Sequence, residues 1–180
     1  GRRSADVRLE SLSRPEVESP LNTVLVQSIS RGDRMDYTLQ KAVELGVHRI
    51  QPIFSQRCEV KLDEDKQAKR LAQWQAIVIS ACEQSGRCYV PEILPIQTYQ
   101  AWLDSFDAHS ELGLVLDPCA KHTLKTLQAP ADRTPIQLLI GPEGGLTDDE
   151  VAQACAQGFH AIRLGPRVLR TETAGAAILA

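Results

Sequence analysis

The chain has 180 residues, of which 43% are hydrophobic, 24% charged and 4% aromatic, and its formal net charge is −3. This length allows one well-packed domain, and the charge excludes the global basic field of many nucleic-acid-binding proteins. No apolar run is long enough to cross a membrane, the N-terminal stretch lacks a signal-peptide core, and the five cysteines show no metal-like spacing. We therefore expect a cytoplasmic protein with reduced thiols and no metal site.

The charges are divided unevenly along the chain. Residues 1–90 contain 14 Lys and Arg and 12 Asp and Glu, whereas residues 91–180 contain 6 and 11. A polyanionic partner is therefore expected to meet the N-terminal half first, although mixed charge is also typical of an ordinary solvated surface.

Predicted strands alternate with predicted helices along the chain. Residues 1–20 resemble a linker, in which Val7 and Leu9 give only a hint of a short strand. We expect strands at 22–29, 49–54, 92–96, 112–116, 136–140 and 161–164, and helices at about 35–45, 63–84, 99–106, 147–157 and from 172 onward, with at most a short helix at 123–127. Several strands are continuous apolar runs, which is typical of an α/β fold with a parallel sheet covered by helices on both faces. Trp74 and Trp102 lie on apolar helix faces and are expected in the core.

A glycine-rich loop with the sequence GPEGG follows the strand predicted at 136–140. Its glycines let the backbone approach a ligand closely. The loop has neither a Walker nor a G-x-G-x-x-G pattern, and the next helix opens with Asp148, Asp149 and Glu150, which disfavour a phosphate at its N-terminus. These features favour a ligand held by backbone hydrogen bonds, such as an adenosine moiety. The alternative is that the loop is only a tight strand-to-helix connection.

A second loop, LGPRVLRTET at residues 164–173, follows the last predicted strand. Val168 and Leu169 are apolar and could form the wall of a base-sized pocket. Arg170 and Glu172 could pair with each other or reach a substrate; the alternative is a surface salt bridge beside two anchoring side chains. Because ligands of open α/β sheets bind beyond the carboxyl ends of the strands, we expect the ligand site at these two loops.

The segments LLIGPEGGLTDDE (138–150) and LGPRVLRTETAG (164–175) closely resemble the two knot-forming segments of the RsmE family. These SPOUT-class methyltransferases methylate N3 of a uridine in 16S rRNA with S-adenosyl-L-methionine. The segments SRGDRMDYTLQKAVELGV (30–47), FSQRCEVKL (54–62) and WQAIVISACEQSGRCYVPEI (74–93) are also similar to the family. The resemblance extends from about residue 22 to the last residue, in the family's order and spacing.

The resemblance implies that residues 21–180 form a SPOUT methyltransferase domain with a C-terminal trefoil knot, and that the domain forms a homodimer. It implies that residues 1–20 are the trailing end of an N-terminal PUA-like RNA-binding domain, and that the last helix continues past Ala180. The cofactor is expected to bind along both loops and the end of the strand at 112–116; the role of Asp117 there stays open. The residues expected to hold it are Leu116, Ile140, Gly141, Pro142, Glu143, Gly144, Gly145, Leu164, Gly165, Val168, Leu169 and Arg170.

Methylation of N3 requires the uracil to lose a proton, and a nearby cation would stabilise the developing anion. We expect Arg170 to supply that cation, with Arg167 as second candidate, and Glu172 to orient Arg170 or to serve as the base. Contacts to 16S rRNA within the small subunit are expected from basic residues of the matched N-terminal segments. These residues are Arg31, Arg34, Lys41, Arg57 and Arg87.

Two other functions stay open from the sequence. The chain could be a SPOUT methyltransferase for another RNA or base, or a non-catalytic RNA-binding knot domain. The upstream segments favour the 16S rRNA assignment over the first alternative. The glycines of the GPEGG loop, together with the intact RVLRTETA segment, favour an enzyme over the second.

Overall fold

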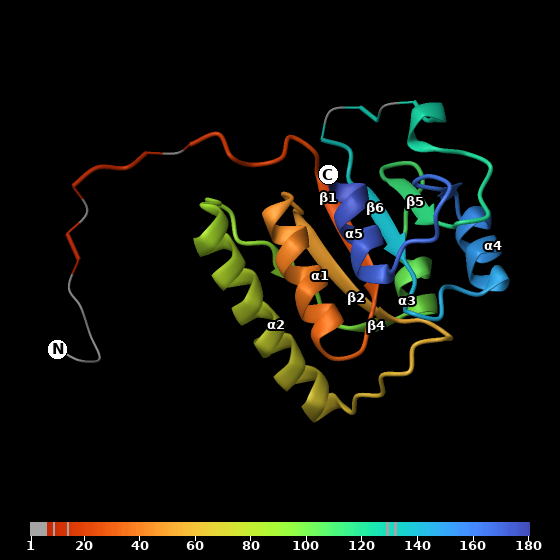
Figure 1. Cartoon of the computed structure of the whole chain (residues 1–180), viewed down its shortest axis with the longest axis horizontal. Coiled ribbons are helices and arrows are strands. Elements are labelled where there is room, and N and C mark those ends of the chain that lie inside the picture. Colours follow the sequence, from red (N-terminus) through yellow and green to blue (C-terminus); the bar gives the residue numbers. More distant parts are fainter. Residues whose placement is uncertain (1–6, 9, 14, 129, 132) are drawn as a thin grey trace.

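The computed structural model of the chain describes residues 7–8, 10–13, 15–128, 130–131 and 133–180. Its strands are β1 (Thr23–Ser28), β2 (Arg49–Phe54), β3 (Glu92–Ile93), β4 (Gln97–Thr98), β5 (Leu112–Leu116), β6 (Ile136–Ile140) and β7 (His160–Ile162). They form one sheet in the order β3-β2-β1-β6-β5-β7, with β4 also paired to β2 (Figure 1). Every pairing is parallel, so the predicted parallel sheet is confirmed.

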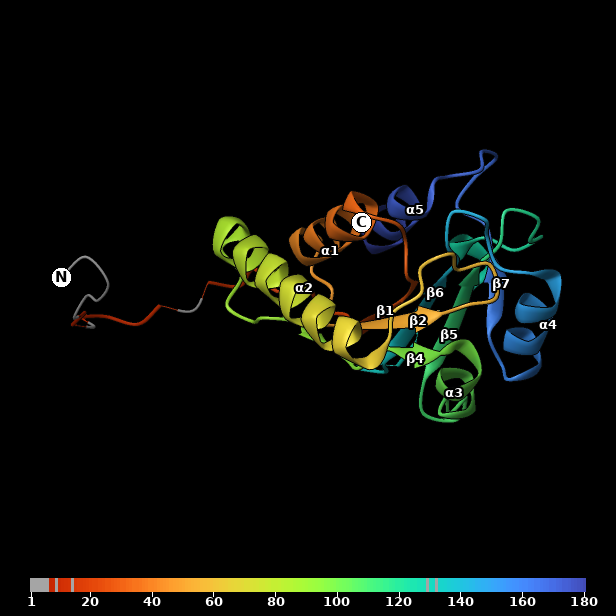
Figure 2. The same ribbon diagram turned by 90° about the horizontal axis from the view of Figure 1, so that it is seen from below.

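Helices cover both faces of the sheet, because successive side chains of a strand point to opposite faces. The helices are α1 (Asp33–Glu44), α2 (Glu64–Ser85), α3 (Tyr99–Asp104), α4 (Asp148–Ala156) and α5 (Thr171–Leu179), with a short 3₁₀ turn η1 (Leu124–Thr126). Leu25 of β1 packs with α1, α2 and α5, whereas Val24 and Val26 pack with α3 and α4. Figure 2 shows α1 and α5 on one side of the sheet and α3 on the other. Trp74 and Trp102 are both buried, as expected.

Side-chain caps fix three helix starts. The Asp63 carboxylate accepts a hydrogen bond from the Lys66 amide at 2.9 Å, and the Thr98 hydroxyl accepts one from the Ala101 amide at 3.2 Å. Thr147 and Glu150 form the reciprocal capping box at the start of α4. These bonds satisfy amides that the first helical turn leaves without a partner.

The strand predicted at 92–96 is instead two short strands, β3 and β4, paired with different parts of β2. The interruption lies beside Pro52, which has no N–H to donate to a neighbouring strand. The Gln51 side chain bridges the gap, because its Nε2 donates to the carbonyl oxygens of Pro52 and Pro95 at 2.9 and 2.8 Å. The last strand also ends earlier than predicted, at Ile162.

The described residues that precede β1 contain no helix or strand. The hint of a strand at Val7 and Leu9 is therefore not realised in the described part, and Leu9 itself lies outside it. Glu18 holds this segment against the domain by accepting bonds from the Arg87 guanidinium and from the amides of Cys88 and Tyr89. Among the described residues, no helix has the length and apolar character needed to span a bilayer.

Candidate cofactor and substrate site

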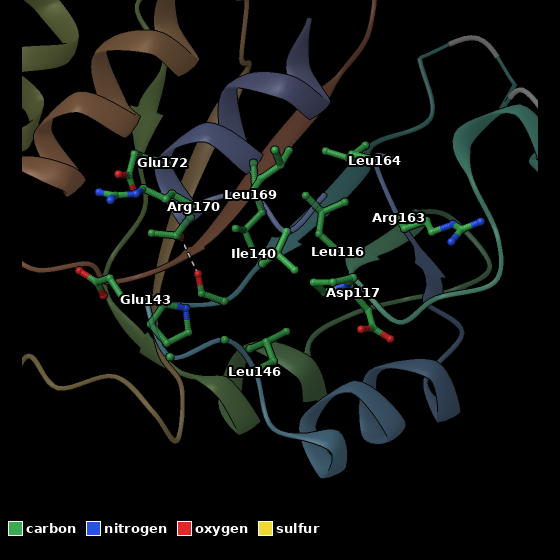
Figure 3. Close-up of a pocket in the computed structure, with 18 of the residues that line it drawn as sticks. Leu116, Asp117, Ile140, Glu143, Leu146, Arg163, Leu164, Leu169, Arg170 and Glu172 are labelled. Atoms are coloured by element: carbon green, nitrogen blue, oxygen red, sulfur yellow. Dashed lines mark hydrogen bonds between the residues drawn. The ribbon is translucent and has the colours of Figure 1, made fainter. Parts of the chain in front are cut away.

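A cavity of about 490 Å³ opens where β5, β6 and β7 end, as Figure 3 shows. Leu116, Ile140 and Ile162, the last residues of these strands, form its floor. This position is the carboxyl edge of a parallel sheet, and the volume lies within the usual range of small-molecule sites. All twelve residues that the sequence predicted for the cofactor line this cavity.

The wall of the cavity combines apolar side chains with exposed backbone. In Figure 3, Leu116, Ile140 and Leu169 lie together on one side, and Leu146 lies across from them. The 141–145 loop adds backbone amides and carbonyls. A Cβ at Gly141 would lie 2.6 Å from the Leu146 nitrogen, so only glycine fits this tight turn. The site therefore suits a flat apolar group whose polar edge is held by the main chain.

A buried hydrogen-bond chain joins the two loops. The Thr171 hydroxyl donates to the Gly141 carbonyl oxygen at 2.6 Å, and its oxygen accepts from Nε2 of Gln27 at 2.9 Å. Gln27 is fully buried in β1, and its Nε2 also donates to the Ser28 carbonyl. Neither Thr171 nor Gln27 carries a strong signal in the sequence; the one local signal is the position of Thr171 within the RTETA segment.

Glu143 connects the GPEGG loop to the start of α1. Its Oε1 accepts bonds from the Arg31 amide at 2.9 Å and from Nη1 of Arg34 at 3.0 Å. Partial burial raises the pKa of the Glu143 carboxyl, but the bonds from Arg31 and Arg34 outweigh burial, and the pKa is lowered from its ordinary value. Glu143 is therefore a charged anchor of the loop at neutral pH.

Two further contacts hold the same loop from the side of β2. Nη1 of Arg57 donates to the carbonyl oxygens of Gly144 and Leu146 at 3.0 and 3.3 Å. The buried Glu150 carboxylate accepts from the Gln56 amide at 2.8 Å and from the Thr147 amide at 2.9 Å. The loop is thus fixed to three other segments of the chain, which favours a preformed site.

The predicted catalytic residues Arg170 and Glu172 both line the cavity. Figure 3 shows them on the side of the cavity where Glu143 lies, with Asp117 and Arg163 on the opposite side. Arg170 is exposed and Glu172 is half-buried. Within the described part of the chain, neither Arg170 nor Glu172 forms an ion pair. Asp117 also lines the cavity, and its carboxylate accepts from the Cys119 amide at 2.8 Å.

The five basic residues that the sequence predicted for RNA contacts all have partners within the chain. Arg31 pairs with Glu59, and Lys41 pairs with Glu44 at 2.8 Å. Arg34 and Arg57 hold the GPEGG loop, as described above. Only Arg34 of the five lines the cavity.

Arg87 is the most buried of the five. Its side chain is only 3% exposed, with the guanidinium bound to Glu18 and to the carbonyl oxygens of Val43 and Val47. A phosphate could bind this guanidinium only by displacing these partners, so the structure lends no support to the expected RNA contact. The residue instead joins the N-terminal segment to α1 and to the end of α2.

All five cysteines are free thiols. Burial raises the pKa of the Cys58 and Cys82 thiols. Among the described residues, no three His, Cys, Asp or Glu side chains are grouped as metal ligands.

Comparison with known proteins places the chain in a family. The model of a family described as an RNA methyltransferase domain matches residues 17–180. Ribosomal RNA small subunit methyltransferase E of Buchnera aphidicola subsp. Schizaphis graminum is 40% identical over 158 residues, which cover 88% of this chain and 63% of that protein. The Bacillus subtilis protein of the same name is 32% identical over 162 residues, covering 87% and 63%. The chain thus spans a little under two thirds of the length of these curated relatives.

A solved structure supports the same family assignment. The crystal structure of a ribosomal RNA small subunit methyltransferase E from Neisseria gonorrhoeae, bound to S-adenosyl methionine, superposes with a TM-score of 0.85 at 49% identity. The match covers 93% of this chain and 67% of that one. The chain therefore belongs to the RNA methyltransferase domain family and, within it, to the ribosomal RNA small subunit methyltransferase E group.

Proposed function

We propose that this chain carries the methyltransferase site of an enzyme that uses S-adenosyl-L-methionine to methylate N3 of one uridine in the 16S rRNA of the small ribosomal subunit. The observation that carries this proposal is the cavity at the carboxyl edge of the sheet, lined by every residue that the sequence assigned to the cofactor. Family membership and the cofactor-bound N. gonorrhoeae relative support the same activity.

The residues of the cavity fit this cofactor. Leu116, Ile140 and Leu169 offer an apolar surface to an adenine ring, and the backbone of residues 141–145 offers hydrogen bonds to its edge. The carboxylates of Glu143 and Glu172 line the same cavity and suit a ligand that carries positive charge. When bound, S-adenosyl-L-methionine supplies an activated methyl group.

Residues of the chain then prepare the acceptor. The uracil must leave any base stack or pair for its N3 to enter the cavity. The Arg170 guanidinium stabilises the negative charge that develops as N3 loses its proton, because it lines the cavity and has no ion-pair partner in the described chain. Glu172, two residues further on, accepts the N3 proton or orients Arg170.

The domain arrangement forms part of the same proposal. Residues 21–180 form a SPOUT domain with a trefoil knot. Support comes from the path of the chain, which runs from β6 through α4 to the edge strand β7 and back to α5, packed against α1 and β1 (Figure 1). We further propose that residues 1–20 are the trailing part or linker of an N-terminal PUA-like RNA-binding domain. The enzyme works in the cytoplasm.

The homodimer is also a proposal. Apart from Glu172 in its first turn, α5 carries no charged residue, and its Ile178 and Leu179 remain half-buried in a single copy of the chain. A second copy packed on α5 would cover them. Light scattering on the purified chain tests this, with a dimer mass expected.

Small ribosomal subunits that lack the modification provide the test of the activity. They are incubated with the chain and methyl-labelled S-adenosyl-L-methionine, and the label is mapped by nuclease digestion and mass spectrometry. One labelled 3-methyluridine in 16S rRNA is expected. Label on another base or another RNA would favour a different SPOUT activity. Cofactor binding without transfer to any RNA would favour a non-catalytic RNA-binding domain.

A further inference from the structure

The basic residues of this chain fall into two groups that differ in their intramolecular partners. The five predicted RNA contacts of the N-terminal half are all engaged with carboxylates or carbonyl oxygens of the chain itself. A phosphate that bound them would have to displace these partners. The excess of positive charge in the N-terminal half is therefore largely neutralised where these residues lie.

The acidic C-terminal half contains two basic residues without ion-pair partners in the described part of the chain. Arg163 and Arg167 are exposed and line the mouth of the cavity. Within residues 15–128 and 133–180, neither side chain takes part in an ion pair with another residue. Figure 3 shows the charged end of Arg163 directed away from Ile140 and Leu169. Arg163 is thus positioned to bind a group outside the cavity rather than a ligand in it.

The backbone beneath Arg163 is fixed. Its amide donates to the His122 carbonyl oxygen at 2.9 Å, and His122 pairs in parallel with Ile162 at the end of β7. The nearest labelled carboxylate in Figure 3 is that of Asp117, whose Oδ1 accepts from the Cys119 amide. Exposed Lys121 precedes His122 and adds positive charge beside the same strand end.

We propose that Arg163 and Arg167 bind backbone phosphates of the RNA strand that presents its uridine to the cavity. This inference rests on the proposed function and names a phosphate site on the β7 side of the cavity mouth. Guanidinium groups bind phosphate oxygens in a bidentate manner, and such contacts set the register of a nucleic acid without reading its bases. The two arginines are therefore positioning residues for the strand, distinct from Arg170, to which the proposed function assigns the reacting base.

The test measures binding of a fluorescent, uridine-containing single-stranded RNA of about 15 nucleotides, the size that single-strand-binding domains cover. The chain is compared with its Arg163→Gln/Arg167→Gln double variant between about 50 and 200 mM salt. Lys41→Gln, from the predicted N-terminal set, and Lys69→Gln, exposed on α2, serve as matched controls that each remove one positive charge. Binding of S-adenosyl-L-methionine is measured on the same samples as a check on the integrity of the cavity.

The double variant should bind the RNA roughly tenfold more weakly at low salt. Its plot of log affinity against log salt should be less steep by about 1.4, or 0.7 for each lost phosphate contact. Lys69→Gln should retain the original slope, Lys41→Gln should change it by less than the double variant does, and all variants should bind the cofactor as the parent does. An unchanged slope in the double variant, a greater loss in Lys41→Gln, or no salt-dependent RNA binding by the parent would each overturn the inference.

Two further outcomes distinguish the phosphate site from the proposed methyltransferase function and from binding of a polyanion other than RNA. Salt-dependent RNA binding that depends on both arginines, without methyl transfer to any RNA, would refute the proposed function but support the phosphate site. A polyglutamate peptide that binds as tightly as the RNA, with the same loss in the double variant, would overturn the assignment to RNA.

Discussion

The hydroxyl of Thr171 donates a hydrogen bond of 2.6 Å to the carbonyl oxygen of Gly141. The two residues begin the two segments that enclose the cavity, the GPEGG loop and helix α5. Thr171 is buried, and its hydroxyl oxygen also accepts a hydrogen bond from Nε2 of Gln27 in β1. The relative position of the two cofactor loops therefore depends on one hydroxyl group.

Thr171→Val should both destabilise the protein and weaken cofactor binding. Valine has a similar shape but removes the hydroxyl partner of the Gly141 carbonyl and of one N–H of the Gln27 amide, at a cost of about 1–3 kcal/mol. Urea unfolding and calorimetric titration with S-adenosyl-L-methionine measure the two effects. Thr171→Ser should retain most of both, and Thr173→Val, at an exposed position two residues on, should change neither. Undiminished cofactor affinity in Thr171→Val would refute the coupling of the two loops.

Glu143→Gln should show a pH-dependent loss of stability. Because the folded-state pKa of Glu143 lies below its ordinary value of 4.5, the charged group contributes stability above that value and loses it as the pH falls through the lower, folded-state pKa. The difference in unfolding free energy between the parent and Glu143→Gln should thus be constant near neutral pH and shrink in acid. Denaturant titrations at a series of pH values measure it. A difference that grows as the pH falls would contradict the assigned direction of the pKa shift.

Glu150→Ala should destabilise the fold around α4. The substitution removes the acceptor of the Gln56 and Thr147 amides, two partly buried bonds that hold the β2–α2 loop and the helix start together. A loss of about 1–3 kcal/mol is expected in chemical unfolding. Asp149→Ala removes a carboxylate from the same helical turn at an exposed position and should have little effect. Equal losses in both variants would indicate that the charge, and not the bonds, matters.

Arg170→Met should lower the single-turnover rate of methyl transfer, measured at saturating cofactor, about 10²- to 10³-fold, because it removes the cation that stabilises the uracil anion. Arg170→Lys should recover part of the rate. Since no ion pair joins Arg170 to Glu172 in the described chain, the effects of Arg170→Met and Glu172→Gln should combine in the double variant. If Glu172 acts only by orienting Arg170, the double variant will instead be no slower than Arg170→Met alone.

The walls of the site could be predicted from the sequence because their signals are local. Glycines within a loop and apolar residues at strand ends form patterns that span only a few positions. The twelve residues expected from the family resemblance to hold the cofactor line one cavity at these loops. The caps at Thr98 and Thr147 depend on equally short patterns, because each capping side chain bonds an amide three residues further on.

The contacts that position these walls could not be predicted in the same way. Gln27 and Thr171 are 144 residues apart, and no local pattern relates them. The role of Arg87 depends on Glu18, and the break between β3 and β4 depends on Gln51 reaching Pro95. Basic residues were the least predictable class, because their availability to RNA depends on which carboxylates and carbonyls the fold brings beside them.

The most direct test of the account is a calorimetric titration of S-adenosyl-L-methionine into the chain and two variants. Leu169→Trp places a large ring into the cavity wall, whereas Thr173→Trp adds the same ring at an exposed position that does not line the cavity. We expect one cofactor per chain, binding abolished or severely weakened by Leu169→Trp, and binding unchanged by Thr173→Trp, with all three proteins folded by circular dichroism. If the parent chain does not bind the cofactor, or if Leu169→Trp binds it as the parent does, the cavity is not the cofactor site.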